Sequence, residues 1–594
     1  MTERGEPDAT GRPGPRRSGS DVAAIVGLLA VGVVVPLILG ALSGSILIPH
    51  NDDASIRRTA LAMYEGRGLE FNGWTSMTLV SQLLFVQPFL WASGGGPWGF
   101  AASTIVFAIV GIVAGYALVR RVLPVRRAFL AVLLVLVFPG FLLHTTSFMT
   151  DVPAWAASFA CLAVGAGALE RDGAARWRWL VGSLVIGCIA FGIREFMVAA
   201  PIAVLAAALA SDRPHARRYV VAGVVVVAVC AAIYLVARAA PGQHEPPLTV
   251  LTERSLLGVV RGFATLALMI SPAVIPGVAA WWRRWRRPDL LAGAVVAALV
   301  YGPLVVGSLA GGGRLRLIVG NSIEPTGVLG IGALAGGRPV LFRAPTWDLL
   351  NLGALLAAVL LLIVLGGALG GFVRAAIADV RAGPGDRWRV LERLGSTRGM
   401  LAVFAAGYGL GMGLWGLVVI TFDRYLWLLV LPLATLFLAA PPALGRREES
   451  PPRAASRARS SVPAWIASAA LMIGIAAVSA ALLLNAHAFE TARWRMGEQA
   501  VALGFAPDEV DAGFEWVTFH ATGTATPYAT GPAHLSRYVA WWPSSRACAM
   551  ASTSPLNGPA FELLVADEAA YRRFLVAGRR EPLYLYRVTG DGCP

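Results

Sequence analysis

Long apolar runs dominate this sequence and constrain its fold more than any other feature. A helix needs about 20 apolar residues to cross the hydrocarbon layer of a membrane. About thirteen runs approach or exceed that length, and they lie at residues 22–44, 98–119, 126–144, 152–169, 178–193, 196–211, 219–239, 258–281, 290–310, 348–372, 399–421, 424–442 and 462–484. Hydrophobic residues make up 56% of the 594 positions and charged residues only 14%, too few to cover a water-soluble surface. The sequence therefore predicts an all-α polytopic membrane protein.

The arginine residues indicate how these spans are oriented. They gather in alternate loops, for example at 120–121, 217–218 and 286–287, which is the positive-inside pattern of cytoplasmic loops. An odd number of spans then places the N-terminus in the cytoplasm and the C-terminus outside, in a bacterial plasma (inner) membrane. The formal net charge of +15 therefore reflects membrane topology, and we expect no binding of nucleic acid.

The composition divides the chain into three parts. Residues 1–20 are rich in Pro, Gly and Arg and are predicted to form a disordered cytoplasmic tail. Residues 21–484 contain the spans. Residues 485–594 have mixed polarity and many turn residues, which predicts a small exported domain of α/β type. If that domain is exported, Cys548 and Cys593 could form a disulfide.

Two segments between the spans are predicted to lie along the outer membrane interface. Residues 53–66 are weakly amphipathic when drawn as a helix. Residues 77–91 are apolar but short, with a proline inside, which favours a second interfacial or re-entrant piece. The stretch 178–211 is open to two interpretations: two short spans joined at Arg194-Glu195, or a single bent element.

Acidic residues follow the outer ends of two spans. Asp52-Asp53 comes directly after the first span, and Asp151 opens another in the stretch FMTDVP, residues 148–153. Adjacent carboxylates at a membrane interface are costly unless they are used, paired or hydrated. One of the pair is a candidate general base, with the other tuning it or holding a cation. The alternative is that each aspartate caps the helix that follows it.

Two arginines stand at the same predicted depth as these acids. Arg194-Glu195 interrupts an apolar stretch, and Asp423-Arg424-Tyr425 precedes the twelfth span. A guanidinium group at either place is suited to gripping a phosphate. The alternatives are an ion pair between Arg194 and Glu195 that closes a tight turn, and anchoring of Arg424 and Tyr425 at the membrane surface.

A metal site and a covering loop are further possibilities. His50 and His144 flank the acidic positions, and with Asp151 they are candidate ligands of a divalent cation, although their spacing carries no metal signature. The loop 311–347, with several arginines, could cover a site. The sequence has neither a Walker-type phosphate loop nor the serine-hydrolase and zinc-protease motifs, which argues against an ATP-driven transporter.

In combination, these motifs resemble those of lipid-linked-sugar glycosyltransferases of the C superfold. The resemblance is especially to the branch that contains protein O-mannosyltransferases and aminoarabinose transferases, the family 39-like enzymes. The resemblance rests on Asp52-Asp53 leading into residues 54–64 (ASIRRTALAMY), on residues 148–154 (FMTDVPA), and on Arg424-Tyr425 at the outer start of a span. It covers residues 20–440 in layout. The chain departs from the family at Asp53, where Glu is usual.

The resemblance implies an inverting transfer of a sugar from a polyprenyl phosphate to a lipid, glycan or protein acceptor. In that mechanism Asp52 is the general base, assisted by Asp53, and Asp151 orients the acceptor or holds a cation. Arg194 and Arg424 then hold the leaving phosphate. Two other functions stay open at this point: a flippase or transporter of a lipid-linked sugar, and a scaffold for assembly of the cell envelope.

Overall fold

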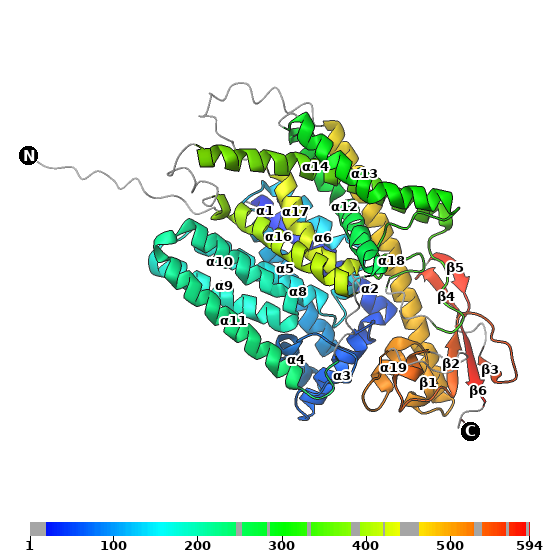
Figure 1. The fold of residues 1–594 in the computed structure, drawn as a ribbon. Helices are drawn as coiled ribbons and strands as arrows, with labels where there is room; N and C mark the ends of the chain where they lie inside the picture. Colours follow the sequence, from blue (N-terminus) through cyan, green and yellow to red (C-terminus); the bar gives the residue numbers. More distant parts are fainter. Residues whose placement is uncertain are drawn as a thin grey trace, which may run out of the picture.

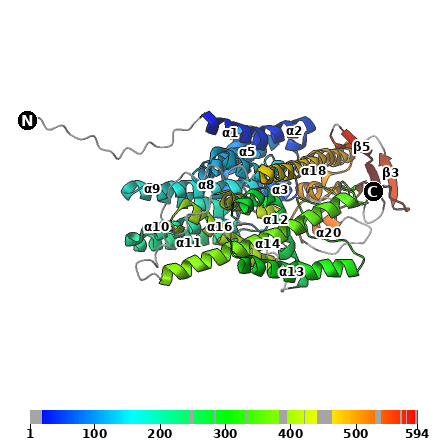
Figure 2. The same ribbon diagram turned by 90° about the horizontal axis from the view of Figure 1, so that it is seen from above.

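The computed structural model describes residues 19–244, 252–281, 285–328, 334–381, 393–419, 422–439, 462–527, 537–565, 570–575, 577–589 and 593. Almost all of the tail predicted at residues 1–20 lies outside these ranges. Within them the chain forms a bundle of long helices, with a small β-sheet at one side of the bundle (Figures 1 and 2).

Apolar helices make up the bundle, as the sequence predicts. Those long and apolar enough to cross a membrane number ten in the part of the chain that the structure describes. They are α1–η1–α2 (Gly19–Leu29, Ala30–Val34, Val35–Ser43), α5 (Pro97–Val119), α8 (Asp151–Leu169), α9 (Gly173–Ile193), η4–α11 (Arg213–His215, Ala216–Ala239), α12 (Glu253–Trp281), α13 (Arg287–Ala310), α14 (Ala344–Arg381), α16 (Thr397–Val418) and α18 (Val462–Ala502). The prediction of a polytopic helical membrane protein is therefore confirmed.

The other three predicted spans are shorter helices that begin or end beside breaks in the backbone. They are α6 with α7 (Val125–Leu136, Phe141–His144), η3 with α10 (Glu195–Val198, Ala199–Ser211), and η6 with α17 (Asp423–Leu426, Trp427–Leu438). Helix α6 ends before Gly140, which has a φ of +88° and lies so close to Ser322 that a Cβ would be 2.8 Å from its Cβ. Stretch 178–211 is two helices, because Arg194 is extended (φ −150°).

The two predicted interfacial segments are helices, α3 (Asp53–Tyr64) and α4 (Val80–Ser93). Helix α3 is buried over most of its length, since Ile56 and Ala60 pack in a core with Leu83 of α4 and Phe148. Helix α19 (Phe514–His520) packs on α3 as well. Protein therefore covers more of α3 than its weak amphipathic pattern indicates.

Residues 485–594 contain the sheet, which agrees with the predicted α/β character. Its strand order is β1-β2-β6-β3, with β1 (Val510–Asp511) parallel to β2 (Ala549–Ser552), and with β6 (Tyr584–Val588) antiparallel to both β2 and β3 (Phe561–Val565). A separate hairpin of β4 (Tyr571–Phe574) and β5 (Ala577–Glu581) and the helices α19 and α20 (Arg537–Trp541) lie in the same region. A disulfide joins Cys548 to Cys593. We call these residues the C-terminal domain; its predicted start, residue 485, lies inside the continuous helix α18.

Candidate active site

Four of the residues singled out in the sequence form one buried chain of ion pairs. Arg424 Nη2 donates to Asp52 Oδ2 at 2.8 Å, and Arg424 Nη1 lies 3.9 Å from Asp151 Oδ2. Arg194 Nη1 donates to Asp151 Oδ1 at 2.8 Å. All four side chains are buried. We call Asp52, Arg424, Asp151 and Arg194 the charged cluster.

Each member of the charged cluster stands where a helix begins or breaks. Asp52 precedes α3, Asp151 is the first residue of α8, Arg194 separates α9 from η3, and Arg424 lies in η6. Asp52 occupies the N-cap position of α3 but makes no capping hydrogen bond with its side chain. Its carboxylate is therefore directed to other partners, which argues against the helix-cap interpretation.

The charged cluster retains unused hydrogen-bonding capacity. Among the described residues, Nε and Nη1 of Arg424 and Oδ2 of Asp151 have no hydrogen-bond partner although they are buried. Buried polar groups without partners cost roughly 1–3 kcal/mol each and are uncommon away from functional sites. A buried guanidinium group with free N–H donors, such as that of Arg424, is suited to an anion with several oxygens, such as a phosphate.

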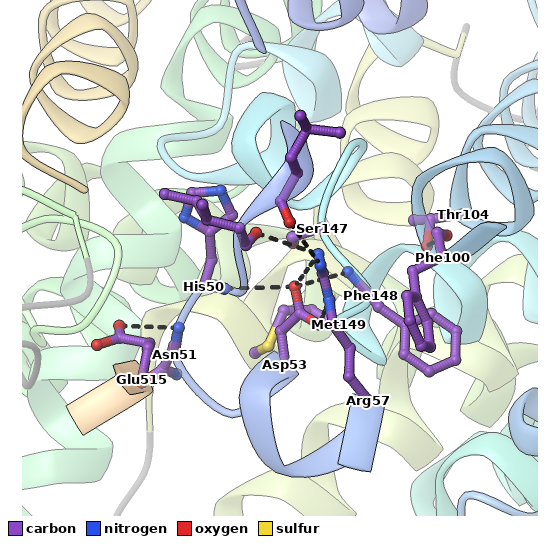
Figure 3. A network of polar contacts seen from close by, with 12 residues as sticks. His50, Asn51, Asp53, Arg57, Phe100, Thr104, Ser147, Phe148, Met149 and Glu515 are labelled. Atoms are coloured by element: carbon purple, nitrogen blue, oxygen red, sulfur yellow. Dashed lines mark hydrogen bonds and ion pairs between the residues drawn. The ribbon is translucent and has the colours of Figure 1, made fainter. Parts of the chain in front are cut away.

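Asp53 has a different environment from that of Asp52. Arg57 donates to both of its oxygens, at 2.6 and 2.9 Å, and the backbone N–H groups of Phe148 and His50 donate to Oδ2 at 3.1 and 3.3 Å (Figure 3). Asp53 has no exposed surface. Its contacts fix α3 against the segment 147–149, so the geometry favours a positioning role for Asp53.

Trp74 is a site residue that the sequence reasoning missed. Its Nε1 donates to Asp52 Oδ1 at 2.9 Å. Its ring lies 4.7 Å from Phe514 and stacks on Trp541 at 5.2 Å, measured between centroids. Trp74 sits in an irregular segment without a motif, so no local signal pointed to it.

The C-terminal domain also contacts the turn that carries Asp52. Asn51 has a positive φ of 53°, and its backbone N–H donates to Glu515 Oε1 at 2.9 Å (Figure 3). Arg58 Nη1 donates to the carbonyl of Thr518 at 3.0 Å, and its guanidinium lies over the ring of Trp542. The domain therefore holds the turn as well as covering it.

Part of the predicted covering loop reaches the charged cluster through Asp423. The backbone N–H groups of Ser322 and Ile323 donate to the Asp423 carboxylate at 2.8 to 3.0 Å. Among the other charged residues of this loop, Arg338 pairs with Glu490 of α18.

The candidate metal ligands are not gathered into a metal site. No group of three or more His, Cys, Asp or Glu side chains in the described ranges is placed to hold a metal ion. His50 Nε2 contacts the carbonyl of Ser45 at 3.0 Å, and burial lowers the pKa of His50 to about 4. His144 is buried with its ring against Trp427. A site formed by His50, His144 and Asp151 therefore has no support from the geometry.

An apolar groove is lined in part by η6, the helical turn that carries Arg424. It has a volume of about 280 Å³ and runs between α12, α14, α16 and α17, lined by residues such as Phe263, Leu361 and Met412. Leu426, two residues after Arg424, lines it as well. A long apolar chain whose charged end is bound at Arg424 has a surface to follow there.

Residues 85–237 match the family model described as dolichyl-phosphate-mannose-protein mannosyltransferase. This part of the chain is therefore similar to that family of mannosyltransferases. The match covers about a quarter of the chain and contains Asp151 and Arg194 of the charged cluster. It confirms the resemblance to glycosyltransferases of the C superfold that the sequence motifs carry. No curated protein sequence matches the chain.

Two crystal structures of ArnT from Cupriavidus metallidurans are weakly similar to this chain. The apo structure is 15% identical, with 84% of this chain and 85% of that chain covered and a TM-score of 0.33. The structure bound to undecaprenyl phosphate is 13% identical, with 83% and 84% covered and a TM-score of 0.34. Because these values are low, no residue of this chain is assigned from them.

Proposed function

We propose that this protein is an inverting membrane glycosyltransferase that moves a sugar from a polyprenyl-phosphate donor to a hydroxyl group of an acceptor on the non-cytoplasmic face. The match of residues 85–237 to the mannosyltransferase family model supports the reaction class. The observation that carries the assignment of residues is the charged cluster, in which Asp52 lies against Arg424 and Arg424 lies near Asp151. The charged cluster brings together a candidate base, Asp52, and two candidate phosphate-binding residues, Arg424 and Arg194.

Arg424 and Arg194 hold the phosphate in this proposal. The donor phosphate bridges a sugar and a lipid, and the charge on its oxygens grows as the bond to the sugar breaks. Fixed guanidinium groups in a buried place stabilise that charge, an effect that mutagenesis of other enzymes puts at roughly 3–4 kcal/mol per donor. The unpartnered N–H groups of Arg424 are the first candidates, and Asp151 orients both arginines.

Asp52 is the general base in the same scheme. Arg424 donates a hydrogen bond to Oδ2 of Asp52, and Trp74 donates one to Oδ1. When Arg424 turns toward the donor phosphate, Oδ2 becomes free to accept the proton of the acceptor hydroxyl. The hydroxyl oxygen then attacks the anomeric carbon from the face opposite the phosphate, the bond from that carbon to the phosphate oxygen breaks, and the sugar configuration inverts.

The surroundings of the charged cluster fit a lipid-borne donor. The groove beside Leu426 gives the polyprenyl chain an apolar surface between helices. The Cys548–Cys593 disulfide in the C-terminal domain is typical of an oxidising compartment, which supports an exported domain and a site on the non-cytoplasmic face of a bacterial plasma membrane. The acceptor is a lipid, glycan or protein that reaches the membrane surface.

The test is the release of polyprenyl phosphate from polyprenyl-phosphate sugars by the purified protein and by Asp52→Asn. Asparagine keeps an oxygen for the Trp74 hydrogen bond, so the fold is expected to survive. Loss of a general base predicts a fall of about 10²- to 10⁴-fold in rate. Asp348→Asn, which changes an exposed acid on α14, is the matched control and is expected to retain full activity.

Two outcomes contradict this proposal. Equal release by Asp52→Asn and the control removes Asp52 as the base. Retention of the donor's anomeric configuration in the product, read by NMR, excludes a single inverting displacement. A thermal melt of each variant separates loss of chemistry from loss of fold.

A further inference from the structure

A second cavity lies away from the charged cluster, where α18 meets the C-terminal domain. Its volume is about 400 Å³. Its walls come from the end of α2, from the middle and C-terminal half of α18, and from the hairpin strand β4. In Figure 1, α18 lies between α2 and β4, and it contacts both of them. We call it the α18 cavity.

One face of α18 supplies a polar strip to the α18 cavity. His487, Thr491, Arg495 and Gln499 all line it, and their spacing of four residues places them on one side of a helix. Arg572 of β4 lines it from the opposite wall. Among the described lining residues there are two arginines and no acid, so the cavity is basic.

Two lining side chains carry buried polar atoms without partners. His487 has no exposed surface, and its Nδ1 bonds to Ser45 Oγ. Its Nε2 has no partner in the described part of the chain, and the same holds for Thr491 Oγ1. When Ser45 donates to Nδ1, the ring carries its proton on Nε2 and presents a donor. Unsatisfied buried groups of this kind indicate a site for a ligand that forms hydrogen bonds.

We propose that the α18 cavity binds a phosphate-bearing anion, separately from the sugar donor. Arg495 and Arg572 supply positive charge from two walls, and guanidinium groups match the geometry of phosphate oxygens. His487 and Thr491 supply neutral donors at the buried end. None of these residues belongs to the charged cluster, so the two sites use different side chains.

The position of the cavity favours a phospholipid headgroup as the source of that phosphate. Leu42, which lines the cavity, is 81% exposed and lies at the end of the candidate span α1–η1–α2. A lipid whose acyl chains lie along α2 brings its headgroup to this level. A free phosphate in solution has the same chemistry, and the experiment distinguishes the two sources.

The test is calorimetric titration of the full-length protein in a non-ionic detergent. The probes are inorganic phosphate, short-chain phosphatidylglycerol and short-chain phosphatidylcholine. Arg495→Gln and Arg572→Gln change exposed side chains and are expected to fold; each is expected to raise the dissociation constant about tenfold, or about 1.4 kcal/mol. Thr491→Val, which removes only the hydroxyl group, is expected to raise it severalfold. Arg579→Gln, on β5 and outside the lining, is the matched control.

Binding of phosphatidylglycerol that weakens in the lining variants supports a headgroup site, and comparable binding of inorganic phosphate supports a free anion. Absence of binding of all three probes overturns the proposal. Equal binding by the control and the lining variants overturns it as well. Asp52→Asn is expected to bind these probes as the wild type does, so failure here and failure of the proposed transfer reaction are distinguishable.

Discussion

Glu515 joins the C-terminal domain to the turn that carries Asp52, and removing it tests that connection. Glu515 Oε1 accepts the backbone N–H of Asn51 at 2.9 Å, and Oε2 pairs with Arg493. Arg493 pairs in addition with Glu490, which pairs with Arg338 at 3.1 Å. All of these charged side chains are buried. The turn is therefore held by a network rather than by a single bond.

The structure sets the size of the expected effect for Glu515→Ala. The N–H of Asn51 loses its acceptor, which costs roughly 1–3 kcal/mol for a buried donor. Arg493 loses one of its two carboxylate partners. Complete loss of the partner of a buried charge costs roughly 3–5 kcal/mol, and the cost here is smaller because Glu490 still pairs with Arg493. We expect a loss of roughly 4 kcal/mol. Glu562→Ala breaks an exposed pair with Arg587 and is expected to cost less than about 1 kcal/mol.

The assay combines an apparent thermal midpoint in detergent with the rate of polyprenyl-phosphate release. Glu515→Ala is expected to lower the midpoint, in keeping with a loss of roughly 4 kcal/mol, and to reduce the rate, because the turn that positions Asp52 loosens. Glu515→Gln keeps an acceptor for the Asn51 N–H but removes the charge beside Arg493. Its midpoint and its rate are therefore expected to lie between those of the wild type and Glu515→Ala. If Glu515→Ala melts with the Glu562→Ala control and retains full activity, the network does not hold the turn.

Three further predictions concern the same region. Asp53→Asn removes the negative charge that pairs with Arg57, so a loss of roughly 3–5 kcal/mol in the free energy of unfolding is expected. A thermal midpoint equal to that of the wild type contradicts the positioning role. His50 has a folded pKa of about 4, below its usual 6.5, so its contribution is fully present above pH 6.5 and is lost as the pH falls toward 4, by roughly 3 kcal/mol. His50→Gln is expected to flatten that part of the melting profile, and an unchanged slope refutes it. Reduction of the Cys548–Cys593 disulfide is expected to cost about 2–4 kcal/mol. A thiol reductant should therefore lower the thermal midpoint of the wild type, whereas it should leave the midpoint of Cys548→Ala unchanged.

Much of the fold follows from local sequence properties. Hydropathy alone locates the ten long apolar helices in the described part of the chain, because the lipid solvent requires long apolar segments whose backbone groups are satisfied within each helix. The breaks at Arg194 and Arg424 are also visible, since a charge inside an apolar stretch must face protein or water. Chemical type and common depth were enough to select Asp52, Asp151 and both arginines.

Only the tertiary structure decides which of these groups meet and how each is used. Asp52 and Arg424 are 372 positions apart, and no periodicity carries information over that distance. The different environments of Asp52 and Asp53 follow from packing, because α3 directs Asp53 into the protein toward Arg57 and leaves Asp52 to Trp74 and Arg424. Glu515 contacts the turn that carries Asp52 only because the C-terminal domain packs against that turn. Composition and pattern are local, whereas contacts depend on how the helices pack, and the division between sequence and structure lies there.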